Sequence, residues 1–125
     1  MQAYNQQRPL REFCKKNNIS ITSYSTLGAY DSSLRSSNTD KFPKLLDHPV
    51  VKSIASNRSK STAQILLRHL LQEGVIVIPK SIHAERIKSN IDIFDFELSD
   101  DEMKQLNALD KLESGRIFNY LAFKG

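Results

Sequence analysis

Three polar side chains follow a short apolar run in the stretch VIVIPKSIHAERIKSN. Lys80 and Ser81 come directly after the run and its proline, and Arg86 lies in the helical pattern that follows. An ammonium group, a hydroxyl donor and a planar guanidinium at the start of a helix are well suited to bind a phosphate monoester. The alternative is a solvated Lys80 and a surface ion pair between Arg86 and Glu85 or Asp92. Spacing alone does not decide between them.

A second polar stretch, SYSTLGAYD, directly follows a predicted strand. Tyr24 offers a flat face to a planar ring, and Gly28 lets the backbone approach a ligand closely. Ser25 lies between them at the same strand end. The alternative is that Tyr24 belongs to the core and Gly28 serves only a turn.

Helices and strands alternate in the predicted order, which is typical of an α/β fold. We expect three parallel strands with crossover helices, and the VIVI strand lacks alternation, which predicts burial on both faces. Two Ser-to-Gln/Glu pairs at capping-box spacing mark helix starts, and Gly74 is placed to end the first of these helices. The expected elements are a helix from Pro9, a strand from Ile19, a polar loop over 27–43, a short helix over 44–58 interrupted at Pro49, a helix from Thr62, the strand 75–78, a helix over 84–90, a strand over 91–94, and a last helix that ends near Gly115.

Composition sets the class of protein. The 125 residues are enough for one domain, with 39% hydrophobic and 26% charged residues, as in an ordinary globular protein. The net charge of +4 is concentrated in the first half, but the charges are scattered without interleaved aromatic residues, which argues against a nucleic-acid partner. No stretch is apolar enough to span a membrane. Cys14, the only cysteine, has helical spacing with Leu10 and Phe13, so we expect it to be buried in a cytoplasmic protein.

Four ordered segments together resemble the C-terminal half of the aldo-keto reductases. They are ITSYSTLGA, TAQILLRHLLQEGV, VIPKSIHAERIKSN and IFDFELSDDEMKQLNALD, and the resemblance runs from about Arg8 to Phe118. That family uses NADP(H) and a (β/α)8 barrel. The resemblance therefore implies a partial (β/α)8 TIM barrel, roughly the last three strands with their helices, and NADPH-dependent reduction of small aldehydes or ketones.

The resemblance implies cofactor roles for the residues of SYSTLGAYD. Tyr24 matches the tyrosine that stacks on the nicotinamide. Ser25, Leu27 and Gly28 match the residues that line the pyrophosphate.

The residues of VIVIPKSIHAERIKSN match those that bind the adenosine end of the cofactor in the family. Lys80, Ser81 and Arg86 are expected to hold the 2′-phosphate of NADPH, and Asn90 to contact the adenine. Asp31 matches an acidic residue that pairs with Lys80 and closes a loop over the cofactor.

Four positions depart from the family pattern. Thr26 and Ala84 replace prolines, so both turns lose rigidity without losing a ligand group. Ser89 replaces an acidic residue beside the adenine, which weakens the expected contact. His69 replaces a large aromatic residue and is expected to pack in the core rather than act in catalysis.

No stretch matches the family's catalytic aspartate, tyrosine, lysine and histidine. We therefore expect a cofactor-binding fragment of an enzyme, either as part of a longer gene product or completed by a second chain. The alternative is a catalytically inactive truncated isoform or remnant with residual nucleotide binding. Its open sheet edges favour self-association.

Overall fold

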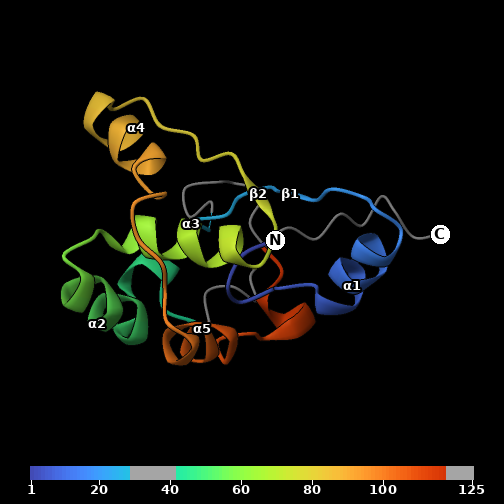
Figure 1. Cartoon of the computed structure of the whole chain (residues 1–125). Helices are drawn as coiled ribbons and strands as arrows, with labels where there is room; N and C mark the ends of the chain where they lie inside the picture. The colour runs from blue at the N-terminus through green and yellow to red at the C-terminus, as the bar shows by residue number, and fades with distance from the viewer. Residues whose placement is uncertain (29–41, 118–125) are drawn as a thin grey trace.

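The computed structural model describes residues 1–28 and 42–117 (Figure 1). Helices dominate this part of the chain, with one small sheet among them. The elements in order are α1 (Arg8–Lys16), β1 (Thr22–Ser23), the 3₁₀ helix η2 (Leu45–Asp47), α2 (Pro49–Arg58), α3 (Thr62–Gln72), β2 (Ile76–Val77), α4 (Ala84–Ile91), α5 (Asp100–Asn107) and the 3₁₀ helix η3 (Leu112–Gly115).

The helix signals of the sequence are confirmed at two starts. The Ser61 hydroxyl accepts from the Gln64 amide at 3.2 Å, and the Gln64 side chain accepts from the Ser61 amide at 2.9 Å. Ser99 and Glu102 form the same reciprocal box at the start of α5. Gly74 adopts the expected left-handed conformation, with φ of 76°.

The break predicted at Pro49 is confirmed, but one predicted helix end is wrong. The 3₁₀ helix η2 ends at Asp47, and Pro49 occupies the first turn of α2, where its missing N–H is not needed. The last helix does not reach Gly115, because α5 ends at Asn107 and the chain turns before η3.

Helix α3 forms the centre of the molecule. Seven consecutive residues, from Gln64 to Leu70, are buried, and the helix packs against α2, α4, β2 and η2. Its apolar side chains Ile65 and Leu66 lie in the core cluster with residues of α2 and α5. The other buried members of this cluster are Ala3, Tyr4, Leu45, Val51, Ile54, Ala55, Leu98, Leu106 and Leu109.

The polar side of α3 explains why the predicted third strand is absent. Gln64, Arg68 and Gln72 recur every fourth residue, so they share one side of the helix. Gln64 donates to the Asp92 carbonyl at 2.7 Å and Arg68 to the Ile93 carbonyl at 3.1 Å, while Gln72 bonds both the N–H and the carbonyl of Leu98. These side chains bind the backbone of residues 92–98 in place of a neighbouring strand, so the prediction of a strand over 91–94 is wrong.

The sheet has two parallel strands, with Thr22 opposite Ile76 and Ser23 opposite Val77. The expectation that VIVI is buried on both faces is also wrong. Val75 is 2% exposed, whereas Ile76 and Ile78 are 49% and 61% exposed. Among residues 1–28 and 42–117, the helix that packs against β2 is α3, which covers Val75 and leaves Ile76 and Ile78 exposed.

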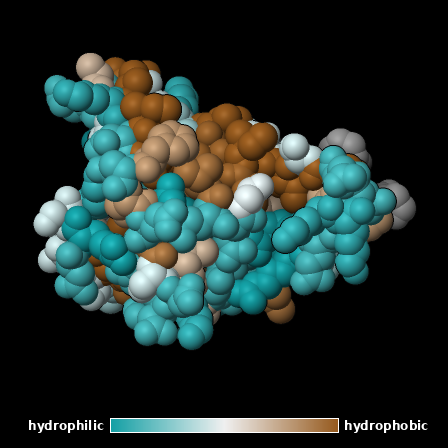
Figure 2. All heavy atoms as spheres, in the orientation of Figure 1, coloured by the Kyte–Doolittle hydropathy of each residue, from teal (hydrophilic) through white to brown (hydrophobic). Residues whose placement is uncertain are grey.

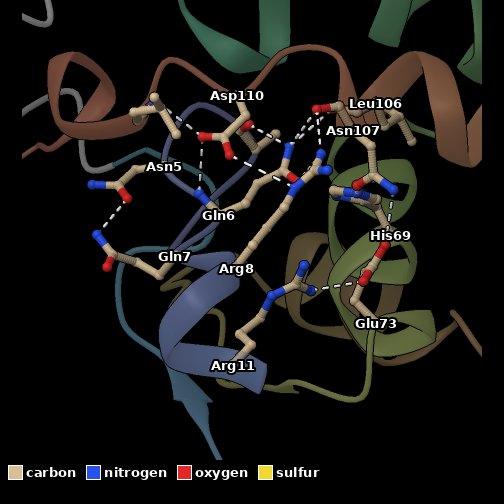
Figure 3. A network of polar contacts seen from close by, with 12 residues as sticks. Asn5, Gln6, Gln7, Arg8, Arg11, His69, Glu73, Leu106, Asn107 and Asp110 are labelled. Carbon is tan, nitrogen blue, oxygen red and sulfur yellow. Dashed lines mark hydrogen bonds and ion pairs between the residues drawn. The ribbon is translucent and has the colours of Figure 1, made fainter. Parts of the chain in front are cut away.

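A polar network ties the N-terminal residues to the end of α5 (Figure 3). The fully buried side-chain amide of Gln6 donates to the carbonyl oxygens of Ala3, Leu106 and Asn107 at 2.9–3.2 Å. Arg8 donates to the same Asn107 carbonyl at 2.8 Å. These donors satisfy carbonyl groups that the end of a helix leaves unpaired.

The network continues to the buried His69. Arg11 donates to Glu73 at 2.8 Å, and Glu73 accepts from the Asn107 amide nitrogen at 2.9 Å. The Asn107 oxygen therefore faces His69 Nε2, 2.8 Å away, so Nε2 carries the proton. His69 Nδ1 is buried and has no hydrogen-bond partner among the described residues. His69 is thus a packing residue, as expected.

Cys14 is buried as predicted, although its helical neighbours Leu10 and Phe13 are 50% and 59% exposed. None of the helices within residues 1–28 and 42–117 is both long and apolar enough to cross a membrane.

His69 should make stability depend on pH. Burial lowers its pKa, as do the nearby Arg11 and Arg8, and the Asn107 hydrogen bond and the Glu73 charge only partly oppose them. Below about pH 6.5, the usual pKa of an unfolded-state histidine, the unfolded chain binds a proton at this histidine more readily than the folded chain does. The free energy of unfolding should therefore decrease as the pH falls, by at most about 1.4 kcal/mol per pH unit. Urea unfolding of the wild type and His69→Phe between pH 7.5 and 5 should show a shallower fall for the variant.

His83→Phe is the matched control, because His83 is exposed at the start of α4. His48 also has a pKa lowered by burial and by Lys111, so it contributes to the pH slope of the wild type and the variants alike. The slope that belongs to His69 is therefore the difference in pH slope between the wild type and His69→Phe. Equal pH slopes for the wild type and His69→Phe would contradict this interpretation.

Candidate functional site

The polar stretches SYSTLGAYD and VIVIPKSIHAERIKSN leave the sheet at the same edge. Because β1 and β2 are parallel, Tyr24 follows β1 and Ile78 follows β2 on the side of their carboxyl ends. Ligands of open α/β sheets bind at this edge. The structure therefore places both predicted groups where such a site is expected.

A tight turn follows β1. The Gly28 amide donates to the Ser25 carbonyl at 2.9 Å, and both residues have left-handed backbones, with φ of 56° at Ser25 and 99° at Gly28. Tyr24 is 64% exposed, so the alternative of a core tyrosine is wrong. Leu27 packs partly against the core cluster, with its backbone in the turn. Asp31, which the sequence assigns to the same site, lies outside the described residues.

The second group surrounds the junction of β2 with α4. Lys80 is exposed in the connection, and the Ser81 hydroxyl accepts from the His83 amide at 3.1 Å. Arg86 lies exposed in the first turn of α4, and Asn90 is half-buried in its last turn.

The first turn of α4 is open to an anion. Its N-cap residue, His83, makes no side-chain capping bond, whereas α2, α3 and α5 all have a side-chain cap. The first N–H groups of α4 therefore have no side-chain acceptor at the cap, and unpaired N–H groups of this kind favour a negative ligand.

The proposed surface ion pair of Arg86 is not formed among the described residues. Asp92 instead contacts Lys60 at 3.3 Å, and Asp95 contacts the same ammonium at 2.7 Å. The Asp95 hydrogen bond raises the pKa of Lys60, although partial desolvation opposes it. Within the described part of the chain, the guanidinium of Arg86 and the ammonium of Lys80 keep their hydrogen-bonding capacity for a ligand.

The two groups share an edge but belong to separate elements. Helix α4 projects from the body of the molecule at the end of the connection from β2 (Figure 1). None of its residues is buried, and its described packing is against α3. A ligand that contacts both Tyr24 and Arg86 must therefore extend along this edge.

A cavity of about 310 Å³ opens beside the turn that follows β1. Tyr24 and Ser25 line it together with Arg116, which pairs with Glu113 at 2.9 Å. The sequence predictions missed the amide-rich N-terminal residues that complete its wall. The remaining lining residues are Met1, Gln2, Asn5, Gln7, Leu10 and Ile117.

The N-terminal residue lies directly against this turn. The Met1 amino group donates to the Tyr24 carbonyl at 3.2 Å, and burial lowers its pKa. In the sequence this wall corresponds only to the short run of amide side chains NQQ over residues 5–7, which has no periodicity. Within residues 1–28 and 42–117, no group of His, Cys, Asp and Glu side chains is arranged to hold a metal ion.

The sequence matches known reductases over most of its length. The chain is 42% identical over 109 residues to aldo-keto reductase family 1 member C15 of Rattus norvegicus and 45% identical over 108 residues to family 1 member A1 of Sus scrofa. It is also 39% identical to the 9,11-endoperoxide prostaglandin H2 reductase of Trypanosoma cruzi. These matches cover 85–86% of this chain but 32–34% of the relatives, so the chain spans about a third of their length.

Solved structures agree with these matches. Crystal structures of Gox0644, one of the apo form and one of a mutant in complex with NADPH, superpose with TM-scores of 0.80 and 0.81 at 34% identity. They cover 95% of this chain, which in turn spans 39% of theirs. The model of the aldo/keto reductase family matches residues 1–111. The chain therefore belongs to the aldo/keto reductase family.

Proposed function

We propose that this chain is the cofactor-binding part of an NADPH-dependent oxidoreductase that reduces aldehydes and ketones to alcohols. The observation that carries the proposal is the exposed cluster of Lys80, Ser81 and Arg86 at the uncapped start of α4. Its residues match the family pattern for a 2′-phosphate, and a solved relative is described in complex with NADPH. The reaction would occur in the cytoplasm, a reducing compartment that suits a single buried cysteine.

The residues fit the two ends of NADPH. Arg86 would bind the 2′-phosphate through two parallel N–H groups, with Lys80 adding a point charge. Asn90, one α4 turn further on, would contact the adenine.

The other end of NADPH would lie at the β1 turn. The exposed ring of Tyr24 would stack on the nicotinamide, and the turn of Ser25, Leu27 and Gly28 would approach the pyrophosphate with its backbone. The half-buried Leu27 fixes the turn on the core and leaves its backbone for this contact. We retain Asp31 as the partner of Lys80 across the cofactor.

When bound, NADPH supplies a hydride, but reduction also needs an acid that protonates the carbonyl oxygen. We propose that the catalytic aspartate, tyrosine, lysine and histidine belong to the part of the fold that this chain does not span. Residues 1–125 would then form the C-terminal part of a (β/α)8 barrel domain, with β1 and β2 as two of its strands. The 125 residues alone would bind nucleotide without turnover.

Arg86→Ala should weaken NADPH binding by about 1.5–3 kcal/mol, the usual contribution of a hydrogen bond to a charged group. NADH lacks the 2′-phosphate, so its affinity should change little. Titration of the reduced-nicotinamide fluorescence measures both affinities.

Lys88→Ala is the matched control, because it also removes a positive charge from the exposed surface of α4. It should cost much less than Arg86→Ala if the guanidinium binds the phosphate directly. Equal losses for NADPH and NADH in Arg86→Ala would show that Arg86 does not contact the 2′-phosphate.

The bare face of the sheet supports a second property, self-association. Hydrophobic surface gathers over the region of the strands and α4 (Figure 2). The exposed apolar residues of β2, the residue after it and α4 include Ile76, Ile78, Ile87 and Ile91, which are 49–68% exposed. Contiguous apolar surface of this kind marks interaction sites, and a two-stranded sheet leaves edges that invite pairing. We propose that copies of the isolated chain associate through this face.

Ile78→Lys should shift the isolated chain toward the monomer, because a charge at the centre of an apolar contact must be desolvated. Sedimentation velocity over a range of concentrations measures the shift. Phe94→Lys is the control, since Phe94 is similarly exposed, at 66%, but lies in the segment bound by α3. A wild-type chain that stays monomeric at all concentrations would contradict the proposal.

A further inference from the structure

Two buried hydroxyl groups, of Ser23 and Thr26, form a hydrogen bond at the base of the turn that follows β1. Thr26 Oγ1 donates to Ser23 Oγ at 2.7 Å, and Ser23 Oγ donates to the Met1 carbonyl at 2.5 Å. Ser23 is 0% exposed and Thr26 is 5% exposed. The direction of the bonds is fixed, because the Met1 carbonyl can only accept. Each buried hydroxyl therefore has a specific partner.

This pair spans the residues that face the cavity. Ser23 is the last residue of β1 and Thr26 lies inside the turn, so Tyr24 and Ser25 form the arc between two bonded side chains. Ser25 has φ of 56°, a left-handed conformation that is unfavourable for a residue other than glycine. Such a conformation persists only where its surroundings hold it.

The bonds between Ser23, Thr26 and Met1 supply that restraint from two sides. The Ser23–Thr26 bond closes the arc, and the bond to Met1 fixes its base on the N-terminal residue. The Met1 amino group in turn donates to the Tyr24 carbonyl. The family pattern has a proline at position 26, which restrains the backbone by its ring. Threonine has no ring, and here its side chain makes the restraining contact.

We propose that Ser23 and Thr26 are a positioning pair that fixes the turn presenting Tyr24 and Ser25 to the nicotinamide end of NADPH. The proposal rests on the cofactor site proposed above. It adds that a hydroxyl–hydroxyl bond takes over the task of the missing proline. Neither residue touches the cofactor, so both act through the turn.

A purely structural role makes a different prediction. If the hydroxyls only satisfy each other in a buried place, their loss lowers global stability and leaves the turn unchanged in the folded state. If they position the turn, their loss loosens Ser25 and so frees the Gly28 amide, which donates to the Ser25 carbonyl. Gly28 therefore reports on the turn without any ligand.

The first test is hydrogen exchange of the Gly28 amide in the whole chain without cofactor. Thr26→Val should speed its exchange about fivefold, the equivalent of one ordinary hydrogen bond, and Ser23→Ala should speed it at least as much, because it also removes the bond to Met1. The double variant should add little to Ser23→Ala, because that change already breaks the bond to Thr26. Thr26→Ser should restore slow exchange. Thr22→Val is the control, since it makes the same chemical change at an exposed position of β1.

The second test is titration of the same variants with NADPH and NADH. Thr26→Val should weaken both by about the same factor of five, unlike Arg86→Ala, and Thr26→Ser should restore both. Faster Gly28 exchange with unchanged affinities would overturn the positioning role, as would Gly28 exchange unaffected by Thr26→Val. Failure of the unaltered chain to bind NADPH would overturn the proposed function instead, and the exchange experiment would still decide whether the pair holds the turn.

Discussion

Helix α3 has to be covered on several sides at once, because seven consecutive residues from Gln64 to Leu70 are buried. Its apolar side chains pack against α2 and the core, and its polar side chains need partners of their own. The side chains of Gln64, Arg68 and Gln72 meet that need by binding the backbone of residues 92–98. This contact fixes the return of the chain from α4 to α5. The position of α4 therefore depends on a polar stripe of α3.

Within the described ranges, the same arrangement leaves the opposite face of the sheet and the outer surface of α4 uncovered. Packing comes from one side only, so Ile76 and Ile78 are exposed, and so are the groups that we assign to NADPH. An exposed phosphate site costs little to form, because Lys80 and Arg86 stay hydrated until a ligand arrives. It also binds more weakly than an enclosed one, since water screens its charges. These features fit a segment that presents cofactor contacts and depends on other parts of a fold to enclose them.

The sequence predicted the local features well. Capping boxes at Ser61 and Ser99 and the left-handed Gly74 follow from short-range chemistry that the residues themselves specify. Cys14 is buried as predicted, but the apolar helix face expected around it is exposed at Leu10 and Phe13. The third strand failed because its backbone partners are side chains of α3, which no periodicity in residues 91–94 reveals. The predicted burial of VIVI on both faces failed for a related reason. An apolar run indicates that a strand can be buried, but it does not show which neighbouring elements cover each face.

The candidate site divides in the same way. The β2–α4 cluster was found because a lysine, a serine and an arginine at one junction have a direct chemical meaning. The cavity wall around Gln2, Asn5 and Gln7 was missed, since it forms only when the N-terminal residues fold back against Tyr24 and Arg116. From the sequence, Thr26 was interpreted only as the loss of a proline that makes the turn rigid. Its bond to Ser23 depends on a turn geometry that spacing does not give.

The central claim is that the start of α4 binds the 2′-phosphate of NADPH. Amide NMR titration of the chain with adenosine 2′,5′-bisphosphate, compared with adenosine 5′-monophosphate, tests it most directly, because the two probes differ in that phosphate alone. We expect the amides of residues 81–86 to shift with the bisphosphate and to respond far less to the monophosphate. Equal shifts with both probes, or shifts confined to other parts of the chain, would contradict the claim.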